Sequence, residues 1–221
     1  RKTMRAKLTC DGTKGKVSGA GDYKYQDLVT VQADTLYGYD FDRWKEDYAA
    51  GEDAKFSFYI EQDTSFTALF KPHEFEVQTK AEEPHMGDVT GVGKYPYKTQ
   101  QKVVAEARYG YVFDHWSDNA PFGKERKFIV ERDTTFTAVF KKAQFNVSLN
   151  ADGIMGRTSG TGKYDYLTPV EVVAYENYGY DFVEWQDKHG NSVSTDRVFI
   201  FNIQGDTILY AVFKIKQFEI R

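Results

Sequence analysis

Residues 38–44 read Gly38-Tyr39-Asp40-Phe41-Asp42-Arg43-Trp44, and the chain repeats this pattern twice. Glycine, tyrosine, phenylalanine and tryptophan keep their spacing in the later copies, Gly110-Tyr111-Val112-Phe113-Asp114-His115-Trp116 and Gly179-Tyr180-Asp181-Phe182-Val183-Glu184-Trp185. The copies begin about 70 residues apart, a period that indicates an array of small repeated units. We interpret the four recurring residues as a structural motif, with tryptophan in the core of each unit.

The period divides the chain into three domains of similar length. We predict repeat 1 at residues 1–71, repeat 2 at 72–141 and repeat 3 at 142–214. Residues 215–221 are then the first strand of a truncated fourth repeat or a tail, because Gln217-Phe218-Glu219-Ile220 matches the opening of earlier units. The chain begins at Arg1 and shows no signal peptide. We therefore expect a fragment of a longer array, in which a missing targeting signal says nothing of location.

Composition excludes several classes of function. The 221 residues carry a formal net charge of −4, with acidic and basic residues mixed along the chain. No block of Lys and Arg marks a nucleic-acid or membrane-surface partner. No apolar run is long enough for a transmembrane helix, so no membrane insertion is expected. Cys10 is the single cysteine. It permits no internal disulfide and is interpreted as a small buried hydrophobe.

Alternating apolar residues predict the strands of each unit. In the first unit they mark Ala6 to Cys10, the run that ends at Ala33, and the motif itself. Trp44 follows Phe41 by three positions and breaks the period of two, so we expect a β-bulge or a strand end there. No segment has a helical period. The fold class is therefore all-β to β-rich α+β, with about five strands in each unit.

A β-hairpin is predicted at the end of each unit. In the first, Phe56, Phe58 and Ile60 alternate, a polar segment follows, and Phe66, Ala68 and Phe70 alternate again. Two such runs joined by a short polar segment are typical of a hairpin. Recurring acids at the turn, Asp63, Asp133 and Asp206, are interpreted as caps that accept backbone hydrogen bonds.

A second recurrent motif contains two glycines and two tyrosines. Its copies are Gly19-Ala20-Gly21-Asp22-Tyr23-Lys24-Tyr25, Gly91-Val92-Gly93-Lys94-Tyr95-Pro96-Tyr97 and Gly160-Thr161-Gly162-Lys163-Tyr164-Asp165-Tyr166. A phosphate cradle and a tyrosine platform for ligands are the functional readings. No Lys-Ser/Thr and no helix signal follow the glycines, so a phosphate loop lacks its context. We favour a bend that lays both tyrosines over the core edge.

The joints between units are short. Lys71-Pro72-His73-Glu74 separates Phe70 from Phe75, and Lys141-Lys142-Ala143-Gln144 separates Phe140 from Phe145. Neither joint has the Gly and Ser of a flexible linker. We therefore expect the units to lie end to end with limited hinge freedom, as an elongated rod.

The ordered motifs resemble the divergent internalin B-repeat domains, relatives of the Listeria–Bacteroides repeat. The resemblance begins at Gly15-Lys16-Val17-Ser18-Gly19, ends at Asp63-Thr64-Ser65-Phe66-Thr67-Ala68-Leu69-Phe70, and recurs over nearly the whole chain. Thr158 in place of valine, and Gln204-Gly205 before Asp206, depart from it, and Gln204-Gly205 is expected to reshape the third hairpin turn. The resemblance implies a β-grasp-like module of bacterial cell-surface and secreted proteins, commonly a stalk, without catalytic residues.

No catalytic, cofactor-binding or metal-binding residue is predicted. The histidines, His73, His85, His115 and His189, lack partners at metal-ligand spacing and do not recur in all units. Asp187-Lys188-His189-Gly190-Asn191 and Asp118-Asn119 carry oxygen ligands but lack the length and the distal glutamate of a calcium loop, so we interpret both as solvated turns.

Three hypotheses of function follow. The first is a non-catalytic spacer in a surface or secreted adhesin-like protein, a monomer whose partners are neighbouring repeats of the same chain. The alternative is a module that binds a host or surface glycan or protein through exposed tyrosines such as Tyr23, Tyr48 and Tyr109. An enzyme fragment, the third, would need a deep pocket with converging titratable groups. Exposure of the tyrosines separates the first two.

Overall fold

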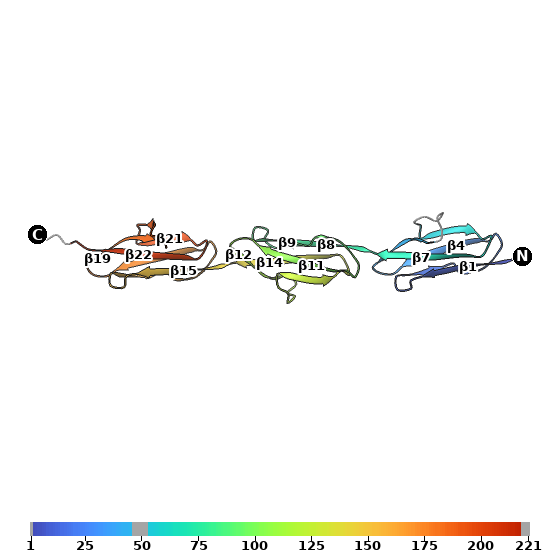
Figure 1. Ribbon diagram of the computed structural model, residues 1–221, viewed down its shortest axis with the longest axis horizontal. Helices are drawn as coiled ribbons and strands as arrows, with labels where there is room; N and C mark the ends of the chain where they lie inside the picture. Colours follow the sequence, from blue (N-terminus) through green and yellow to red (C-terminus); the bar gives the residue numbers. More distant parts are fainter. Residues whose placement is uncertain (1, 46–52, 218–221) are drawn as a thin grey trace. The chain divides into compact units, whose positions relative to one another are not determined.

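Three modules of β-strands make up the part of the chain that the computed structural model describes, residues 2–45 and 53–217 (Figure 1). The first module contains β1 (Thr3–Cys10), β2 (Gly15–Ser18), β3 (Gly21–Lys24), β4 (Leu28–Thr35), β5 (Tyr39–Trp44), β6 (Lys55–Tyr59) and β7 (Thr64–Pro72). The second contains β8 (Glu74–Ala81), β9 (Gly87–Thr90), β10 (Gly93–Pro96), β11 (Gln100–Ala107), β12 (Tyr111–Trp116), β13 (Glu125–Ile129) and β14 (Thr134–Lys142). The third contains β15 (Gln144–Ala151), β16 (Gly156–Ser159), β17 (Gly162–Asp165), β18 (Pro169–Glu176), β19 (Tyr180–Gln186), β20 (Ser192–Ser194), β21 (Val198–Asn202) and β22 (Thr207–Ile215).

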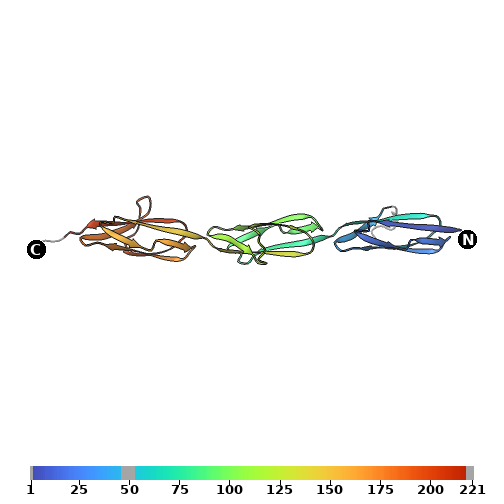
Figure 2. The same ribbon diagram turned by 90° about the horizontal axis from the view of Figure 1, so that it is seen from below.

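Each module is built from two sheets, a four-stranded or five-stranded one and a three-stranded one (Figure 2). In the first module the orders are β3-β1-β7-β5 and β2-β4-β6. The first and last strands, β1 and β7, pair in parallel at the centre of the larger sheet, and the other pairs are antiparallel. The third module repeats this order and adds β20 beside β19.

The fold-class prediction is confirmed: the chain is all-β, in three tandem modules. The resemblance implied a β-grasp-like module; the larger sheet has a central parallel pair, whereas the second layer is a sheet and the described residues contain no helix. The described strands exceed the predicted five because the segments at 15–18 and 21–24 form short strands of their own.

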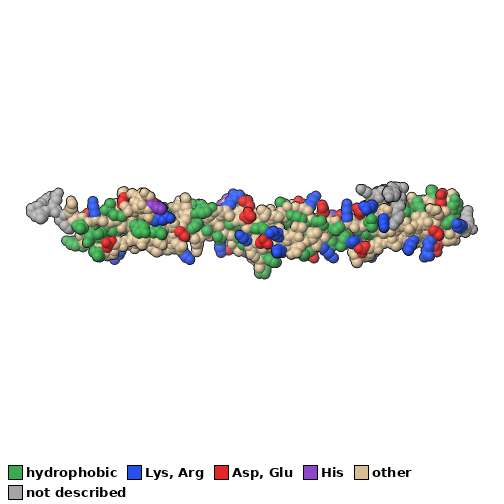
Figure 3. All heavy atoms as spheres, in the orientation of Figure 1, with side chains coloured by type: hydrophobic (Ala, Val, Ile, Leu, Met, Phe, Trp, Pro, Cys, Tyr) green, Lys and Arg blue, Asp and Glu red, His purple; other side chains and the backbone are tan. Residues whose placement is uncertain are grey.

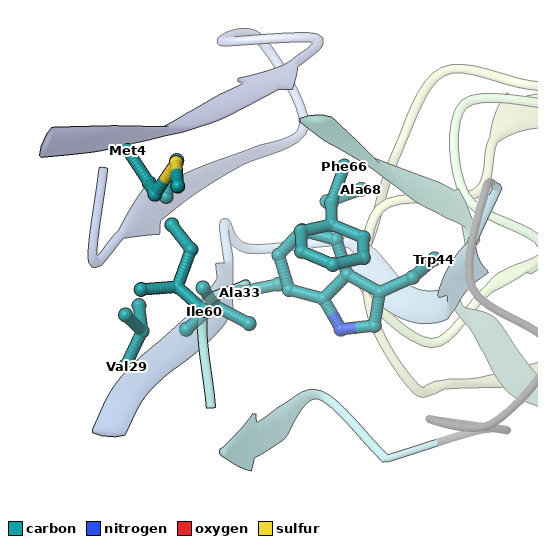
Figure 4. Packing of buried hydrophobic residues seen from close by; sticks show 9 residues of the cluster. Met4, Val29, Ala33, Trp44, Ile60, Phe66 and Ala68 are labelled. Carbon is teal, nitrogen blue, oxygen red and sulfur yellow. The ribbon is translucent and has the colours of Figure 1, made fainter. Parts of the chain in front are cut away.

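The core of the first module lies between its two sheets. Met4, Ala6, Phe66 and Ala68 of β1 and β7 face inward from the larger sheet, and Val29, Val31 and Ala33 of β4 meet them from the smaller one, with Trp44 and Ile60 completing the cluster (Figure 4). The alternation in the sequence is therefore the alternation of core-facing and solvent-facing residues in a two-layer sandwich.

The hairpin prediction is wrong. β6 pairs with β4 in the smaller sheet, whereas β7 pairs with β1 and β5 in the larger one. The two runs face each other across the core, where the rings of Phe56 and Phe66 lie 5.3 Å apart, edge to face. Period-two alternation reports which face of a strand is buried and does not report which strand it pairs with. The connection therefore crosses from one sheet to the other.

The bulge in the aromatic motif is confirmed in all three modules. The pairing of β5 with β7 shifts register between Phe41 and Arg43, and β12 and β19 shift at the equivalent positions. This shift turns the tryptophan inward: Trp44, Trp116 and Trp185 are at most 2% exposed. Each tryptophan packs on the phenylalanine three residues before it, with ring centres 5.5–5.8 Å apart and an interplanar angle of 57°.

The recurring acids do not cap their own turns. Asp63 accepts a hydrogen bond from the backbone N–H of Arg5, 2.8 Å away on β1. Asp133 and Asp206 accept the same bond from Glu76 and Asn146, at 2.7 and 2.8 Å. Each carboxylate therefore ties the first strand of its module to the start of the last strand, a long-range contact that the local sequence does not reveal.

We expect Asp133→Ala to lower the free energy of unfolding by about 1 kcal/mol, because the Glu76 N–H must then bond to water at an exposed site. Asp133→Asn keeps an acceptor oxygen and is the matched control. Chemical denaturation of both variants measures the difference. An alanine variant as stable as the wild type would show that this contact contributes nothing.

By contacts between Cα atoms the described chain forms two compact units. One consists of Arg1–Lys80, Thr90–Val104 and Glu125–Phe136, and the other of Ala81–Val89, Ala105–Lys124 and Thr137–Arg221. The division passes through the second module, so each joint between modules lies inside one unit. The repeat boundaries after residues 71, 141 and 214, and the rod, remain predictions.

Candidate functional site at the module joints

The feature that the modules share outside their cores is the joint between one module and the next. We define joint 1 as Tyr37, Gly38 and Tyr39 with His73, Phe75, Tyr97 and Glu131, and joint 2 as the equivalent Tyr109, Gly110 and Tyr111 with Ala143, Phe145, Tyr166 and Gln204. Both contain a backbone bridge, an aromatic cluster and a hydroxyl bond.

The backbone bridge of joint 1 passes through the linker. The N–H of His73 donates to the carbonyl of Gly38 at 2.9 Å, and the N–H of Tyr97 donates to the carbonyl of His73 at 2.8 Å. Ala143 takes the same place in joint 2: its N–H donates to Gly110, and its carbonyl accepts from Tyr166, both at 2.9 Å. In each joint the linker residue, His73 or Ala143, is therefore hydrogen-bonded to both modules. These bonds restrain the linker, in agreement with its lack of the Gly and Ser of flexible linkers.

The aromatic cluster of joint 1 is built around Tyr97. Its ring meets those of Tyr37 and Tyr39 edge to face, with centres 5.8 and 5.6 Å apart, and Phe75 lies 5.8 Å from Tyr37. Edge-to-face pairs at these distances stabilise by about 0.5–1.5 kcal/mol each beyond the area that they bury.

Joint 2 reproduces this geometry. Tyr166 lies 5.9 Å from Tyr109 and 5.6 Å from Tyr111, both edge to face, and Tyr109 stacks on Phe145 at 6.2 Å. The sequences of the two linkers share only their first lysine. The recurrence of the cluster therefore depends on the aromatic residues of the modules rather than on the linker.

In each joint a tyrosine hydroxyl donates a hydrogen bond to a backbone carbonyl of the following module. Tyr37 donates to the carbonyl of Glu131 at 2.8 Å, and Tyr109 donates to the carbonyl of Gln204 at 2.6 Å. Both acceptors lie in the connection between the penultimate and last strands of the following module. This connection is the segment that was predicted to be a hairpin turn, and one of its carbonyls accepts the hydroxyl bond of the joint.

Glycine is required at the centre of each joint. Gly38 and Gly110 have φ of +84° and +85°, and a Cβ there would lie 2.3 Å from a ring carbon of Tyr97 or Tyr166. Gly179 has the same backbone, with φ of +87°, but nothing lies within 4 Å of its Cβ direction in the described chain. The motif position therefore requires glycine for two reasons. It has a left-handed backbone in every module, and in the two joints a tyrosine ring lies too close for a Cβ atom.

The motif with two glycines and two tyrosines divides its tyrosines between two tasks. The first, Tyr23, Tyr95 or Tyr164, returns its hydroxyl to the carbonyl of the first glycine at 3.0–3.2 Å. That confirms the bend. The second, Tyr97 or Tyr166, packs into the joint with the preceding module instead of over its own core edge, and this part of the interpretation is wrong. Tyr25, the equivalent in the first module, is 47% exposed.

The tyrosines proposed as a ligand platform have structural partners where they are described. Tyr23 is half-buried and bonded to Gly19. Tyr109 is 71% exposed, yet its ring and hydroxyl belong to joint 2. Tyr48 lies outside the described residues. Tyr37 was not predicted from the sequence as a joint residue, although a tyrosine precedes the motif glycine in every unit, at Tyr37, Tyr109 and Tyr178. That recurrence was the available signal.

Within residues 2–45 and 53–217, titratable groups do not converge on a reactive centre. His73 and His115 each lie about 3 Å from one carboxylate, of Asp40 and Asp114. Among the described residues no three His, Cys, Asp or Glu side chains are placed to hold a metal ion, and no helix could span a membrane. Acidic and basic side chains are interspersed on the face shown in Figure 3.

The loop from Asp187 to Asn191 is a hydrogen-bonded turn. Oδ1 of Asp187 accepts from the backbone N–H groups of His189 and Asn191 at 2.8 and 2.9 Å, and Oδ2 accepts from the Asn191 amide at 3.0 Å. Hydrogen bonds from Asn191 lower the pKa of this carboxyl. Both oxygens are therefore used within the turn, as the solvated-turn interpretation expects.

Comparison with known proteins places these features in a family. A family model described as "Divergent InlB B-repeat domain" matches residues 7–74, 77–144 and 145–217. No curated protein matches the chain. Among solved structures, "The Bacillus anthracis TIE protein" is similar, with 12% sequence identity and a TM-score of 0.41 over 97% of this chain. The chain spans 51% of that protein's length.

Proposed function

Because the chain belongs to the family of divergent InlB B-repeat domains, we propose that it is a non-catalytic spacer in a bacterial cell-surface or secreted adhesin-like protein. Domains of this family are typical of bacterial surface proteins. A spacer must keep its modules apart, and it does so only when the joints resist bending.

The repeated joint is the observation that carries this proposal. A freely hinged array needs no more than a covalent linker, whereas each joint here combines a backbone bridge, an aromatic cluster and a tyrosine hydroxyl bond. These contacts are the same in two joints whose linkers differ. We infer the stalk from these contacts and the surface location from the family, and we propose that the chain is a monomer.

Spin labels in neighbouring modules test the proposal. Lys16 on β2 and Glu106 on β11 are exposed, and cysteine at both positions in a Cys10→Ser background provides labels in modules 1 and 2. We expect a single narrow distance distribution by electron–electron double resonance. Tyr37→Phe removes only the hydroxyl bond to Glu131, at an expected cost of about 0.5–1.5 kcal/mol in joint 1, and should broaden the distribution.

A broad distribution in the parent protein would contradict a stiff spacer. The matched control is Tyr178→Phe, in the third module, which should leave the distance between modules 1 and 2 unchanged.

A further inference from the structure

The third module contains a cavity of about 340 Å³ that is open to solvent and whose walls are largely apolar. Phe199 and Phe201 of β21, Ile208 and Leu209 of β22, and Val193 of β20 supply these walls. The turn that begins at Asp187 forms part of the rim. A volume of this size, with apolar walls and a polar rim, is in the range of ligand sites.

The sequence explains why the third module has room at this place. Leu209 occupies the position of Phe66 in the first module and Phe136 in the second. In those modules the phenylalanine ring packs against the strand opposite, with Phe66 5.3 Å from Phe58 and Phe136 4.6 Å from Phe128. In the third module that ring is missing.

The rings opposite Leu209 lack the edge-on partner that their equivalents have in the first module. Phe199 and Phe201 stack with centres 5.3 Å apart and an interplanar angle of 26°, close to the 5.9 Å and 33° of Phe56 and Phe58, but Phe56 and Phe58 also meet Phe66 edge on. A leucine is shorter than a phenylalanine and presents no ring edge. In the first and second modules an aromatic ring, that of Phe66 or Phe136, therefore fills the region that Leu209 leaves open in the third.

A strand edge lies beside the cavity. β21 has a neighbour on one side only, in the order β16-β18-β21, so its other edge has no ladder partner among the described strands. An extended peptide can add to such an edge through backbone hydrogen bonds while one side chain enters an adjoining pocket.

From these observations we propose that the cavity of the third module binds an extended peptide through a single aromatic side chain. The ring takes the place that Phe66 and Phe136 take in the other modules, against Phe199 and Phe201. Asn202 and Gln204, at the rim, lie where the peptide backbone passes. This site is additional to the spacer function and does not depend on it.

The test uses a probe copied from the second module. Thr135-Phe136-Thr137 gives the capped peptide N-acetyl-Thr-Phe-Thr-amide, with N-acetyl-Thr-Ala-Thr-amide as its control. Titration of the full chain is followed by ¹H–¹⁵N NMR. We expect saturable shifts confined to residues 187–193 and 198–209, with binding at least tenfold weaker for the alanine peptide.

Two variants examine the same site. Leu209→Phe restores the residue of the other modules and fills the cavity, so the probe should bind at least tenfold more weakly while the spectrum stays folded. Ile208→Thr, which carries the residue of Thr135, removes an exposed wall of the cavity and should weaken binding several-fold without risk to the fold.

Three results would overturn the proposal. They are no shifts in the parent chain, unchanged binding by both variants, and equal shifts with N-acetylglucosamine, which would assign the cavity to a sugar instead of a peptide.

Discussion

Trp44→Ala is expected to destabilise the first module by about 3–5 kcal/mol. Trp44 is 2% exposed, and its ring meets Phe41, Phe56 and Phe66 at 5.7–6.2 Å. Its Nε1 also donates to the carbonyl of Asp53 at 3.2 Å, so the change leaves an acceptor without its partner. Small domains have only about 5–15 kcal/mol of stability in total, so most of the reserve of this module would be lost.

The expected consequence is local unfolding. In a repeat array, stability is approximately the sum of the modules and their interfaces, so the third module should keep its native signals while those of the first collapse. Thermal unfolding followed by module-resolved ¹H–¹⁵N NMR distinguishes unfolding of the first module alone from unfolding of the whole chain. Trp44→Phe retains a ring in the cavity and should cost less than the alanine change. If the alanine variant melts like the wild type, the tryptophan is not the centre of its core.

The sequence revealed the strands better than their partners. Alternation marked the runs around Phe56 and Phe66 because burial on one face imposes a period of two on any strand of a sandwich. Whether neighbouring runs pair or lie in opposite sheets depends on the whole topology, and a short polar connection suits both. The predicted hairpin was therefore wrong even though both of its strands exist.

The limited hinge freedom of the joints could be predicted from the sequence, but the contacts that form them could not. The absence of Gly and Ser in the linkers indicated limited hinge freedom. The sequence could not show that Tyr97 packs on the preceding module, because its partner Gly38 is remote in the chain. Asp133 was interpreted locally for the same reason, although the N–H that it accepts from belongs to Glu76. In each of these cases the missing information was a long-range contact.

Gly110→Ala is the substitution that we expect to open a joint. Its Cβ would lie 2.3 Å from Tyr166, closer than any real contact, so the ring must leave its place between Tyr109 and Tyr111. Overpacking of this kind costs about 1–3 kcal/mol. The positive φ of +85° adds about 1 kcal/mol or more for any residue with a Cβ. We expect modules 2 and 3 to reorient independently, as judged by ¹⁵N relaxation and residual dipolar couplings.

Gly179→Ala separates the two causes. Its φ of +87° imposes the same backbone strain, and no described atom lies within 4 Å of the new methyl group. The difference between the two variants therefore measures the contact with the tyrosine ring alone. Should both lose equal stability and leave the modules tumbling together, the aromatic cluster would be a passive neighbour, and stiffness would have to come from the backbone bridge through Ala143.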